Sequence, residues 1–307
     1  MRWIAKAAAL QALDRLPGGD RVHYFVQRHV QHGLPISDRK LRRKFDAAAG
    51  HLDAFLARRP GTDPATITAY EFGAGWTQAV PLSLAALGVG QQVLLDIRPH
   101  LRLDQFNHGV ARLNHLRPEL EQATGRAVRD LGGPFSSLAE VEDRLGIVYR
   151  APCDARSTGL DSGSVDLVTS TVTCEHIAAD VLTPIFAECH RILRGDGVLA
   201  CTIDLQDHYA NFDRSITRYN FLKFSERTWS LANPGLHYQN RLRASDYLRA
   251  LDNAGFDVDV TSRGLPDDPT QLGISRVAPR FAGYEAEDLA TFSLRLSATP
   301  RPAALTR

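Results

Sequence analysis

The feature that most constrains the fold is a regular alternation of short, β-rich runs with helix-length segments, which begins at Thr66. Seven runs fit strands: TITAYEF (66–72), QVLLDI (92–97), GIVYRAP (146–152), VDLVTST (165–171), VLACTID (198–204), FDVDVTS (256–262) and TFSLRLSA (291–298). Strands separated by helical segments are typical of a parallel sheet with crossover helices on both faces. We therefore predict an α/β fold with a doubly wound, Rossmann-like sheet.

The same pattern predicts how the chain is divided. Residues 1–65 show helix signals and no strand signal, so we expect an N-terminal helical segment there, followed by a sheet domain over 66–298. Two connections, at about 98–146 and 205–244, are too long for plain loops and are predicted to be helical insertions. The tail, 299–307, is expected to be mobile.

Composition narrows the classes of function. The 307 residues are 44% hydrophobic and 23% charged, which is typical of a globular protein and excludes collagen-like, coiled-coil and disordered chains. Lys and Arg number 36 against 35 Asp and Glu, so no overall field draws the protein to nucleic acid or to an anionic membrane. The four cysteines form no CxxC pair and no apolar run has the length of a membrane span, so we expect reduced thiols and a cytoplasmic location. Peripheral membrane contact by the first helix is a less favoured alternative.

The first strand leads into a bend with two glycines, EFGAGW, before the next helix. Gly73 and Gly75 allow backbone angles and a close approach that a Cβ would block, so a ligand can rest against bare peptide N–H groups at the helix N-terminus. In an open parallel sheet this end of the strands is the usual place for a ligand. The GxG pattern alone is equally compatible with a turn that binds nothing.

Acidic residues after the next two strands favour a ligand site. Asp96 ends the second strand, where a carboxylate can accept hydrogen bonds from the ribose of a nucleoside. Asp154 follows the third strand, where a polar side chain can reach an adenine amino group. Carboxylates at these positions have no packing role, so together with the glycine bend they predict a nucleoside cofactor.

The residues around the bend favour S-adenosylmethionine over NAD. A dinucleotide site expects a third glycine where this chain has Gln78. Glu71, just before the first glycine, is unfavourable beside a pyrophosphate and favourable beside a cation. S-adenosylmethionine carries an ammonium and a sulfonium group and no phosphate, so it suits a carboxylate at this position.

Over roughly residues 66–260 the sequence resembles the class I S-adenosylmethionine-dependent methyltransferases, of the small-molecule or glycan, type 11-like kind. EFGAGW is similar to the family's first motif, LLDI to its ribose-binding strand, CDARSTGLDSGSVDLVTSTVTCEHI to its adenine loop and fourth strand, and AECHRILRGDGVLACTID to its helix, turn and fifth strand. The resemblance implies a mixed, mainly parallel seven-stranded sheet with one antiparallel strand. The cofactor-binding residues that it implies are Glu71, Gly73, Ala74, Gly75, Asp96, Ile97, Asp154, Ala155 and Thr171. The chain departs from the family pattern at the third glycine and in its longer insertion after Asp96.

The resemblance also implies that the acceptor lies above the ends of the fourth and fifth strands. The fifth strand is followed by Asp204, Asp207 and His208, and we predict that His208 with Asp207 forms an acid–base element, because a carboxylate can stabilise an imidazolium. A solvated turn is the alternative. A metal site at these residues lacks a third well-spaced imidazole, so no metal is predicted. Glu175-His176 is more readily explained as ordering the loop near the cofactor.

The sequence therefore predicts an S-adenosylmethionine-dependent methyltransferase that acts on an oxygen or nitrogen atom of a small or medium acceptor: a metabolite, a glycan or a biosynthetic intermediate. A non-catalytic binding or scaffold protein with the same fold is the alternative from a different class. An RNA methyltransferase and an NAD-dependent enzyme are less favoured, because the charge is near neutral and Gln78 replaces a glycine. The sequence leaves the oligomeric state and the identity of the acceptor open.

Overall fold

The computed structural model describes residues 2–16, 22, 24–25, 28 and 33–302, and its centre is a seven-stranded sheet in the order β3-β2-β1-β4-β5-β7-β6. The strands are β1 (Thr68–Phe72), β2 (Gln91–Leu95), β3 (Ile147–Arg150), β4 (Val165–Thr171), β5 (Leu193–Asp204), β6 (Phe256–Gly264) and β7 (Ser293–Pro300). All pairs are parallel except those of β7, which is antiparallel to both β5 and β6. The predicted mixed sheet, with the last strand antiparallel, is confirmed.

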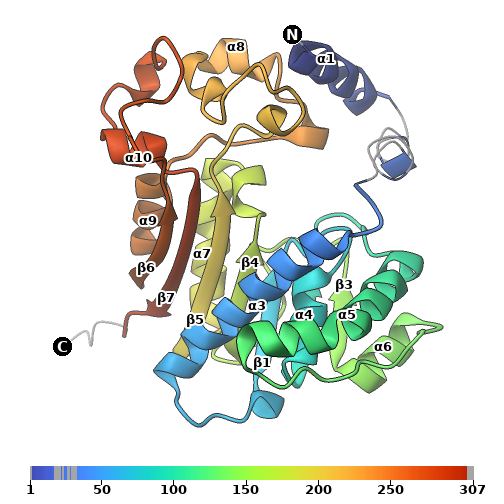
Figure 1. Cartoon of the computed structure of the whole chain (residues 1–307). Helices are drawn as coiled ribbons and strands as arrows, with labels where there is room; N and C mark the ends of the chain where they lie inside the picture. The colour runs from blue at the N-terminus through green and yellow to red at the C-terminus, as the bar shows by residue number, and fades with distance from the viewer. Residues whose placement is uncertain (1, 17–21, 23, 26–27, 29–32, 303–307) are drawn as a thin grey trace.

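Helices cover both faces of the sheet (Figure 1). They are α1 (Arg2–Asp14), α3 (Asp38–Arg58), α4 (Ala79–Ala86), α5 (Leu103–Thr124), α6 (Leu138–Leu145), α7 (Ala179–Ile192), α8 (Glu226–Ser230), α9 (Ala244–Asn253) and α10 (Ala286–Ala290). Side chains of a strand alternate between faces, so Leu167 of β4 packs with α3, α4 and α5, whereas its neighbour Val168 packs with α7 and α9. All residues of β4 are buried, as expected of a central parallel strand.

Helix α3, from the N-terminal segment, belongs to the core of the sheet. Phe45, Leu52 and Phe55 on one face of this helix are fully or almost fully buried in the same cluster as β1 and β4. The first two turns of the helix carry five cations: Arg39, Lys40, Arg42, Arg43 and Lys44. The helix therefore crosses the sheet beside the C-terminal end of β1 and can contribute side chains to a site there (Figure 1).

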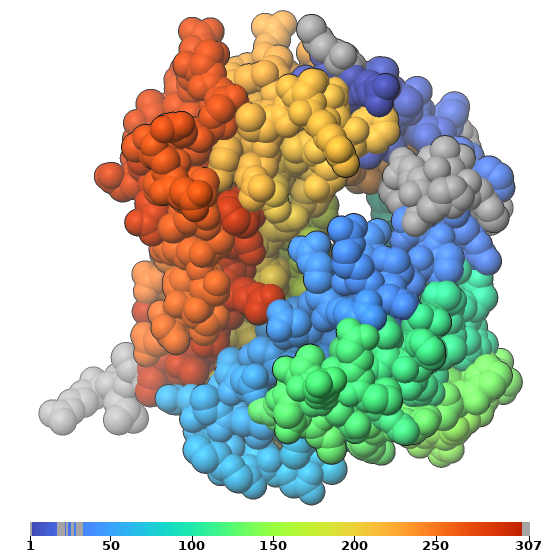
Figure 2. Space-filling model, viewed as in Figure 1, coloured from blue at the N-terminus to red at the C-terminus, as the bar shows by residue number. Residues whose placement is uncertain are grey.

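A separate cover, here called the lid, consists of residues 205–237 and 265–292. Its core joins Tyr209, Trp229 and Phe281 to Trp3 of α1. In the space-filling view the yellow and orange residues of the lid lie over one edge of the molecule, with the blue α1 beside them (Figure 2). The sequence predicted the first of the two lid segments; the second, between β6 and β7, was not predicted.

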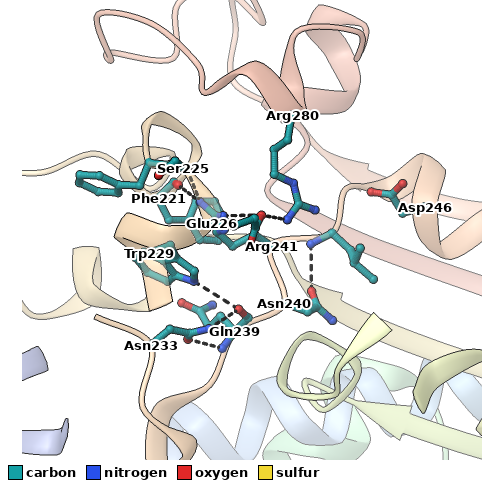
Figure 3. A network of polar contacts seen from close by, with 12 residues as sticks. Phe221, Ser225, Glu226, Trp229, Asn233, Gln239, Asn240, Arg241, Asp246 and Arg280 are labelled. Atoms are coloured by element: carbon teal, nitrogen blue, oxygen red, sulfur yellow. Dashed lines mark hydrogen bonds and ion pairs between the residues drawn. The ribbon is translucent and has the colours of Figure 1, made fainter. Parts of the chain in front are cut away.

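The lid is fixed to the body by residues 238–243, here called the hub segment (Figure 3). Arg241 is buried, and its guanidinium donates hydrogen bonds to the carbonyl oxygens of Phe221 at 2.8 Å and Phe224 at 2.6 Å. The same group forms an ion pair with Glu226 at 2.6 Å. Because a carbonyl in the lid core has no water to bind, these bonds hold the lid chain at a defined distance from the hub segment.

The C-terminal boundary differs from the prediction. Strand β7 continues to Pro300, and Thr299 pairs with Asp257 of β6, so residues expected in a mobile tail belong to the sheet. The Arg301 backbone N–H also donates to Gly255 O at 2.8 Å. Residues 303–307 lie outside the described part of the chain.

Two further expectations concern thiols and membranes. All four cysteines are free, and three are buried, as expected of thiols that act as small apolar side chains. None of the helices in the described part of the chain combines the length and apolarity needed to cross a membrane.

Arg243 provides a test of how the lid is held. Its fully buried guanidinium donates to the carbonyl oxygens of Leu205 at 3.0 Å and Leu289 at 3.1 Å, one in each lid segment. Arg243→Met is expected to lower the free energy of unfolding by about 3–5 kcal/mol, because buried carbonyls lose their donors. Arg249→Met on α9, where the side chain is 65% exposed, should change it by less than about 0.5 kcal/mol. Urea unfolding measures both, and equal effects would contradict this role for Arg243.

Candidate functional site

A cavity of about 520 Å³ lies at the C-terminal ends of the central strands. It is lined by the bend after β1, the start of α4, the cationic face of α3, and residues at the adjoining ends of β4, β5 and β7. Strands β1 and β4 are neighbours, and the chain runs outward from β1 to β2 and β3 before it returns to β4. This is the point at which strand order reverses, where open α/β sheets bind ligands.

The two glycines of the bend have different structural roles. Both have left-handed backbone angles, with φ +73° at Gly73 and +67° at Gly75. A Cβ on Gly73 would lie 2.2 Å from Cγ2 of Thr173, so this glycine is needed for the close approach of the β4 loop. A Cβ on Gly75 would meet no atom closer than 3.9 Å, so its missing side chain leaves space on the cavity side.

Gln78 takes over the conformation that a third glycine would provide. It is the N-cap of α4 with φ +43°, in the left-handed region that side chains rarely adopt. Its side-chain amide donates a hydrogen bond to the carbonyl oxygen of Gly75. That bond offsets the backbone strain, so the departure from the glycine pattern keeps the geometry of the bend.

Asp96 connects the end of β2 to the bend. One carboxylate oxygen accepts a hydrogen bond from Gly75 N at 3.0 Å and the other from Arg98 N at 3.1 Å, and the residue is buried. A carboxylate has about four lone-pair positions, so it can still accept bonds from ligand hydroxyls. The adjacent Ile97 is 69% exposed, which offers an apolar surface to a ligand ring.

The loop after β3 approaches Asp96, but its acidic side chain is turned to another partner. Cys153 N donates to Asp96 O at 2.9 Å, which places Asp154 and Ala155 beside the end of β2. The Asp154 carboxylate forms an ion pair with Arg156 at 2.6 Å, which lowers its pKa. Asp154 therefore lies in the predicted region, and it must give up part of this contact to reach a ligand.

Glu71 and Thr171 lie at the inner wall of the cavity. Glu71 is buried, and its carboxylate accepts a hydrogen bond from the Thr169 hydroxyl at 2.9 Å; burial raises its pKa. The Thr171 hydroxyl contacts Nε2 of His51 at 2.9 Å, and its carbonyl oxygen accepts a bond from Nζ of Lys44 at 3.0 Å. The Thr171 side chain thus points to α3, and its backbone faces the cavity.

Sequence reasoning missed the contribution of α3. Lys40, Arg43 and Lys44 from this helix line the cavity. The run DRKLRRKF was a visible signal, but a cationic run on a helix normally marks a solvated face. Only the packing of Phe45 and its neighbours against the sheet turns these cations toward the strand ends.

At the end of β5, the partner of His208 is Asp204. Nε2 of His208 lies 3.5 Å from an Asp204 carboxylate oxygen, an ion-pair distance longer than a good hydrogen bond. Burial disfavours the imidazolium, but the carboxyl groups of Asp204, Glu175 and Asp207 together outweigh this effect and raise the pKa of His208, Asp204 most of the three.

The predicted pairing of His208 with Asp207 is therefore corrected. Asp207 is fully buried, and its carboxylate accepts hydrogen bonds from Tyr209 N at 2.9 Å and from the Asn220 side chain at 3.0 Å. It caps the short 3-10 helix His208–Asn211. Asp207 thus sets the position of the His208 backbone, and both of its carboxylate oxygens accept hydrogen bonds from lid residues.

Glu175 and His176 lie in the 3-10 turn Cys174–His176 after β4, next to His208. The rings of His176 and His208 are 5.0 Å apart between centroids. Glu175 is buried, and burial raises the pKa of its carboxyl to about 8. The hub segment fixes this turn, because Asn240 N donates to Glu175 O at 2.9 Å.

Comparison with known proteins gives one family match and several distant structural likenesses. A family model described as a methyltransferase domain matches residues 135–201. No curated protein sequence matches the chain.

Three solved structures illustrate these likenesses. The CurJ carbon methyltransferase is 12% identical, with a TM-score of 0.42 over 80% of this chain and 51% of that one, so the chain spans about half its length. The YcgJ protein from Bacillus subtilis is 12% identical, with a TM-score of 0.44 over 82% of this chain and 100% of that one. A geranyl diphosphate C-methyltransferase from Streptomyces coelicolor A3(2), solved with Mg²⁺, geranyl diphosphate and S-adenosyl-L-homocysteine, is 16% identical, with a TM-score of 0.41 over 82% of this chain and 77% of that one.

The bend makes a prediction about stability. Alanine at Gly73 or at Gly75 carries the left-handed strain of about 1–2 kcal/mol, and alanine at Gly73 also overlaps Thr173, which should add about 1–3 kcal/mol. The double variant Gly73→Ala/Thr173→Ala should recover most of that addition. Urea unfolding of the wild type, Gly73→Ala, Thr173→Ala and the double variant forms a double-mutant cycle. Absence of coupling between positions 73 and 173 would refute the close approach.

Proposed function

We propose that the chain is a class I S-adenosylmethionine-dependent methyltransferase and that it transfers the methyl group to an oxygen or nitrogen atom of a small or medium-sized acceptor. The methyltransferase-domain match over residues 135–201 and the seven-stranded sheet with β7 antiparallel support this proposal. The observation that carries the proposal is the bend at Gly73–Gly75, which opens onto the cavity beside the Asp96 carboxylate. A metabolite, a glycan or a biosynthetic intermediate is the proposed kind of acceptor.

We propose that the cofactor lies along the bend from β1 to β2. Asp96 is suited to accept bonds from the ribose hydroxyls, and the exposed Ile97 is suited to pack against the adenine. Asp154 and Ala155 would border the adenine from the loop after β3. Glu71, with the bare backbone of the bend, complements the cationic methionine end, because S-adenosylmethionine carries an ammonium and a sulfonium charge.

Methyl transfer is a displacement in which a lone pair of the acceptor attacks the methyl carbon. The bond from that carbon to sulfur breaks, and its electron pair stays on sulfur as S-adenosylhomocysteine is formed. The reaction depends more on alignment of the attacking atom, the methyl carbon and the sulfur than on a strong acid or base. A base is needed only where the attacking hydroxyl or amine must lose a proton.

His208 is the proposed acid–base residue, with Asp204 in the supporting role first expected of Asp207. Asp204 lines the cavity and lies 3.5 Å from the imidazole, so it stabilises the imidazolium that forms when the acceptor proton is taken up. Asp204 ends β5 and His208 begins the 3-10 helix that follows, at the edge of the sheet where we propose that the acceptor lies.

Gly75→Ala is expected to weaken S-adenosylmethionine binding by at least tenfold, about 1.4 kcal/mol, because the new methyl group occupies cavity space beside the bend. The matched control is Gly163→Ala, because Gly163 has a similar backbone angle (φ +64°), an open side and a position in the turn before β4. Calorimetric titration measures both affinities. Equal loss in the two variants, or none in Gly75→Ala, would mean that the bend is only a turn.

His208→Ala is expected to lower turnover about 10²–10⁴-fold and to leave the affinity for S-adenosylmethionine unchanged. Turnover is measured with methyl-labelled cofactor and an acceptor found by screening metabolite and glycan pools. A fall of less than about threefold would show that alignment alone drives the transfer.

The pH dependence separates Asp204 from Asp207. The neutral imidazole is the base, so turnover should rise with pH through the raised pKa of His208. Asp204→Asn removes the charge that raises this pKa, and the rise should move to lower pH. An unmoved profile in Asp204→Asn would remove Asp204 from the proposal.

A further inference from the structure

The Glu175 carboxylate is buried without a partner. The residue is 2% exposed, and neither of its carboxylate oxygens has a hydrogen-bond partner in the described part of the chain. Buried polar atoms are almost always paired, so an unpaired buried carboxyl group indicates a missing partner. Protonation alone does not supply one, because the neutral acid would still leave its O–H without an acceptor.

His176 next to it is oriented as a ligand. Its Nδ1 lies 2.7 Å from the carbonyl oxygen of Tyr238, in the hub segment. A carbonyl oxygen only accepts, so Nδ1 carries the proton and Nε2 keeps the lone pair. A histidine that donates one ring N–H to a backbone carbonyl is the usual outer-shell arrangement of a metal ligand. His176 is also exposed, which gives the site an entry path.

His208 completes the group. One ligand atom from each of Glu175, His176 and His208 lies within 4.8 Å of the other two. The three residues come from two different loops, and the hub segment holds both: Gln239 accepts a bond from His208 N at 3.0 Å. Within the described part of the chain Nε2 of His208 has no hydrogen-bond partner, and its ion-pair partner is the Asp204 carboxylate at 3.5 Å.

We infer that Glu175, His176 and His208 form a binding site for one divalent transition-metal cation. Two imidazoles and one carboxylate suit Zn²⁺, Co²⁺, Mn²⁺ or Fe²⁺ better than Mg²⁺ or Ca²⁺, which prefer oxygen ligands throughout. Three protein ligands leave coordination positions open. The sequence predicted no metal, because Asp204, Asp207 and His208 offer only one imidazole and the turn after β4 is distant from them in the sequence.

The inference deepens the proposed function. Cation binding itself does not depend on that function, whereas a catalytic role of the cation rests on the proposed acceptor being nearby. A neutral imidazole has one nitrogen lone pair, so His208 either binds the cation or accepts a proton. In the cation-free protein His208 keeps the acid–base role. In the loaded protein Glu175, His176 and His208 would hold the cation, which would lower the pKa of a bound hydroxyl or water so that the proton leaves to solvent.

The test uses the untagged full chain after treatment with a chelator. Titration with Zn²⁺ by calorimetry, and with Co²⁺ by visible absorption, should show one site per chain. The melting temperature should rise with added Zn²⁺, because the cation binds the folded state. Glu175→Gln and His176→Ala should each weaken binding about 100-fold or more. The control His115→Ala replaces an exposed histidine on α5 and should bind as the wild type does.

The same preparations keep the inference separate from the proposed reaction. Glu175→Gln should retain S-adenosylmethionine affinity, measured by calorimetry, while it loses the Zn²⁺-dependent rise in melting temperature. If Glu175→Gln does not fold, His176→Ala gives the same readouts from an exposed position. Absence of one-to-one Zn²⁺ or Co²⁺ binding in the wild type, or unchanged affinity in the folded ligand variants, would overturn the metal site and leave the methyltransferase assignment intact.

Discussion

The Asn240 side chain is the contact on which the turn after β4 depends. Its amide donates to the carbonyl oxygens of Cys174 and Ile177, both at 2.8 Å, and so encloses the turn that carries Glu175 and His176. Its amide oxygen accepts bonds from Leu242 N at 2.9 Å and from the Tyr247 hydroxyl at 3.1 Å. Each of these groups is buried or partly buried, so the amide cannot be replaced by water without a cost. These bonds therefore fix the position of the turn after β4 relative to both the hub segment and α9.

The bend after β1 and the group of Glu175, His176 and His208 are built in different ways. The bend consists of backbone at the ends of neighbouring parallel strands, with Gly73 N bonded to Leu95 O at 2.8 Å and Asp96 bonded to Gly75 N. The second group consists of side chains from two loops far apart in the sequence, and the hub segment bonds to both loops through Asn240 N and the Gln239 side chain. A substitution at the bend changes local geometry, whereas one in the hub segment changes the positions of His176 and His208 together.

Helix α3 brings a cation near two buried acidic groups. Glu71 and Glu175 are both buried, and Lys44 lines the cavity together with Glu71. Burial lowers the pKa of Lys44, while the charges of Glu71 and Glu175 raise it in part. Burying two acidic groups is costly unless a cation compensates them. One helix therefore supplies apolar side chains to the core and a positive charge to the cavity.

The sequence by itself determined the sheet, the bend and the acid after β2. Strand and helix periods are local, and a glycine bend followed by a strand-end carboxylate occupies the same place whenever the sheet forms. The tertiary structure decided the rest. It selected Asp204 over Asp207 as the partner of His208, because Asn220 of the lid occupies the Asp207 carboxylate. It also turned Lys44 into the cavity and joined Glu175 to two histidines. These relations depend on which distant segment buries each side chain, and no local pattern in the sequence carries that information.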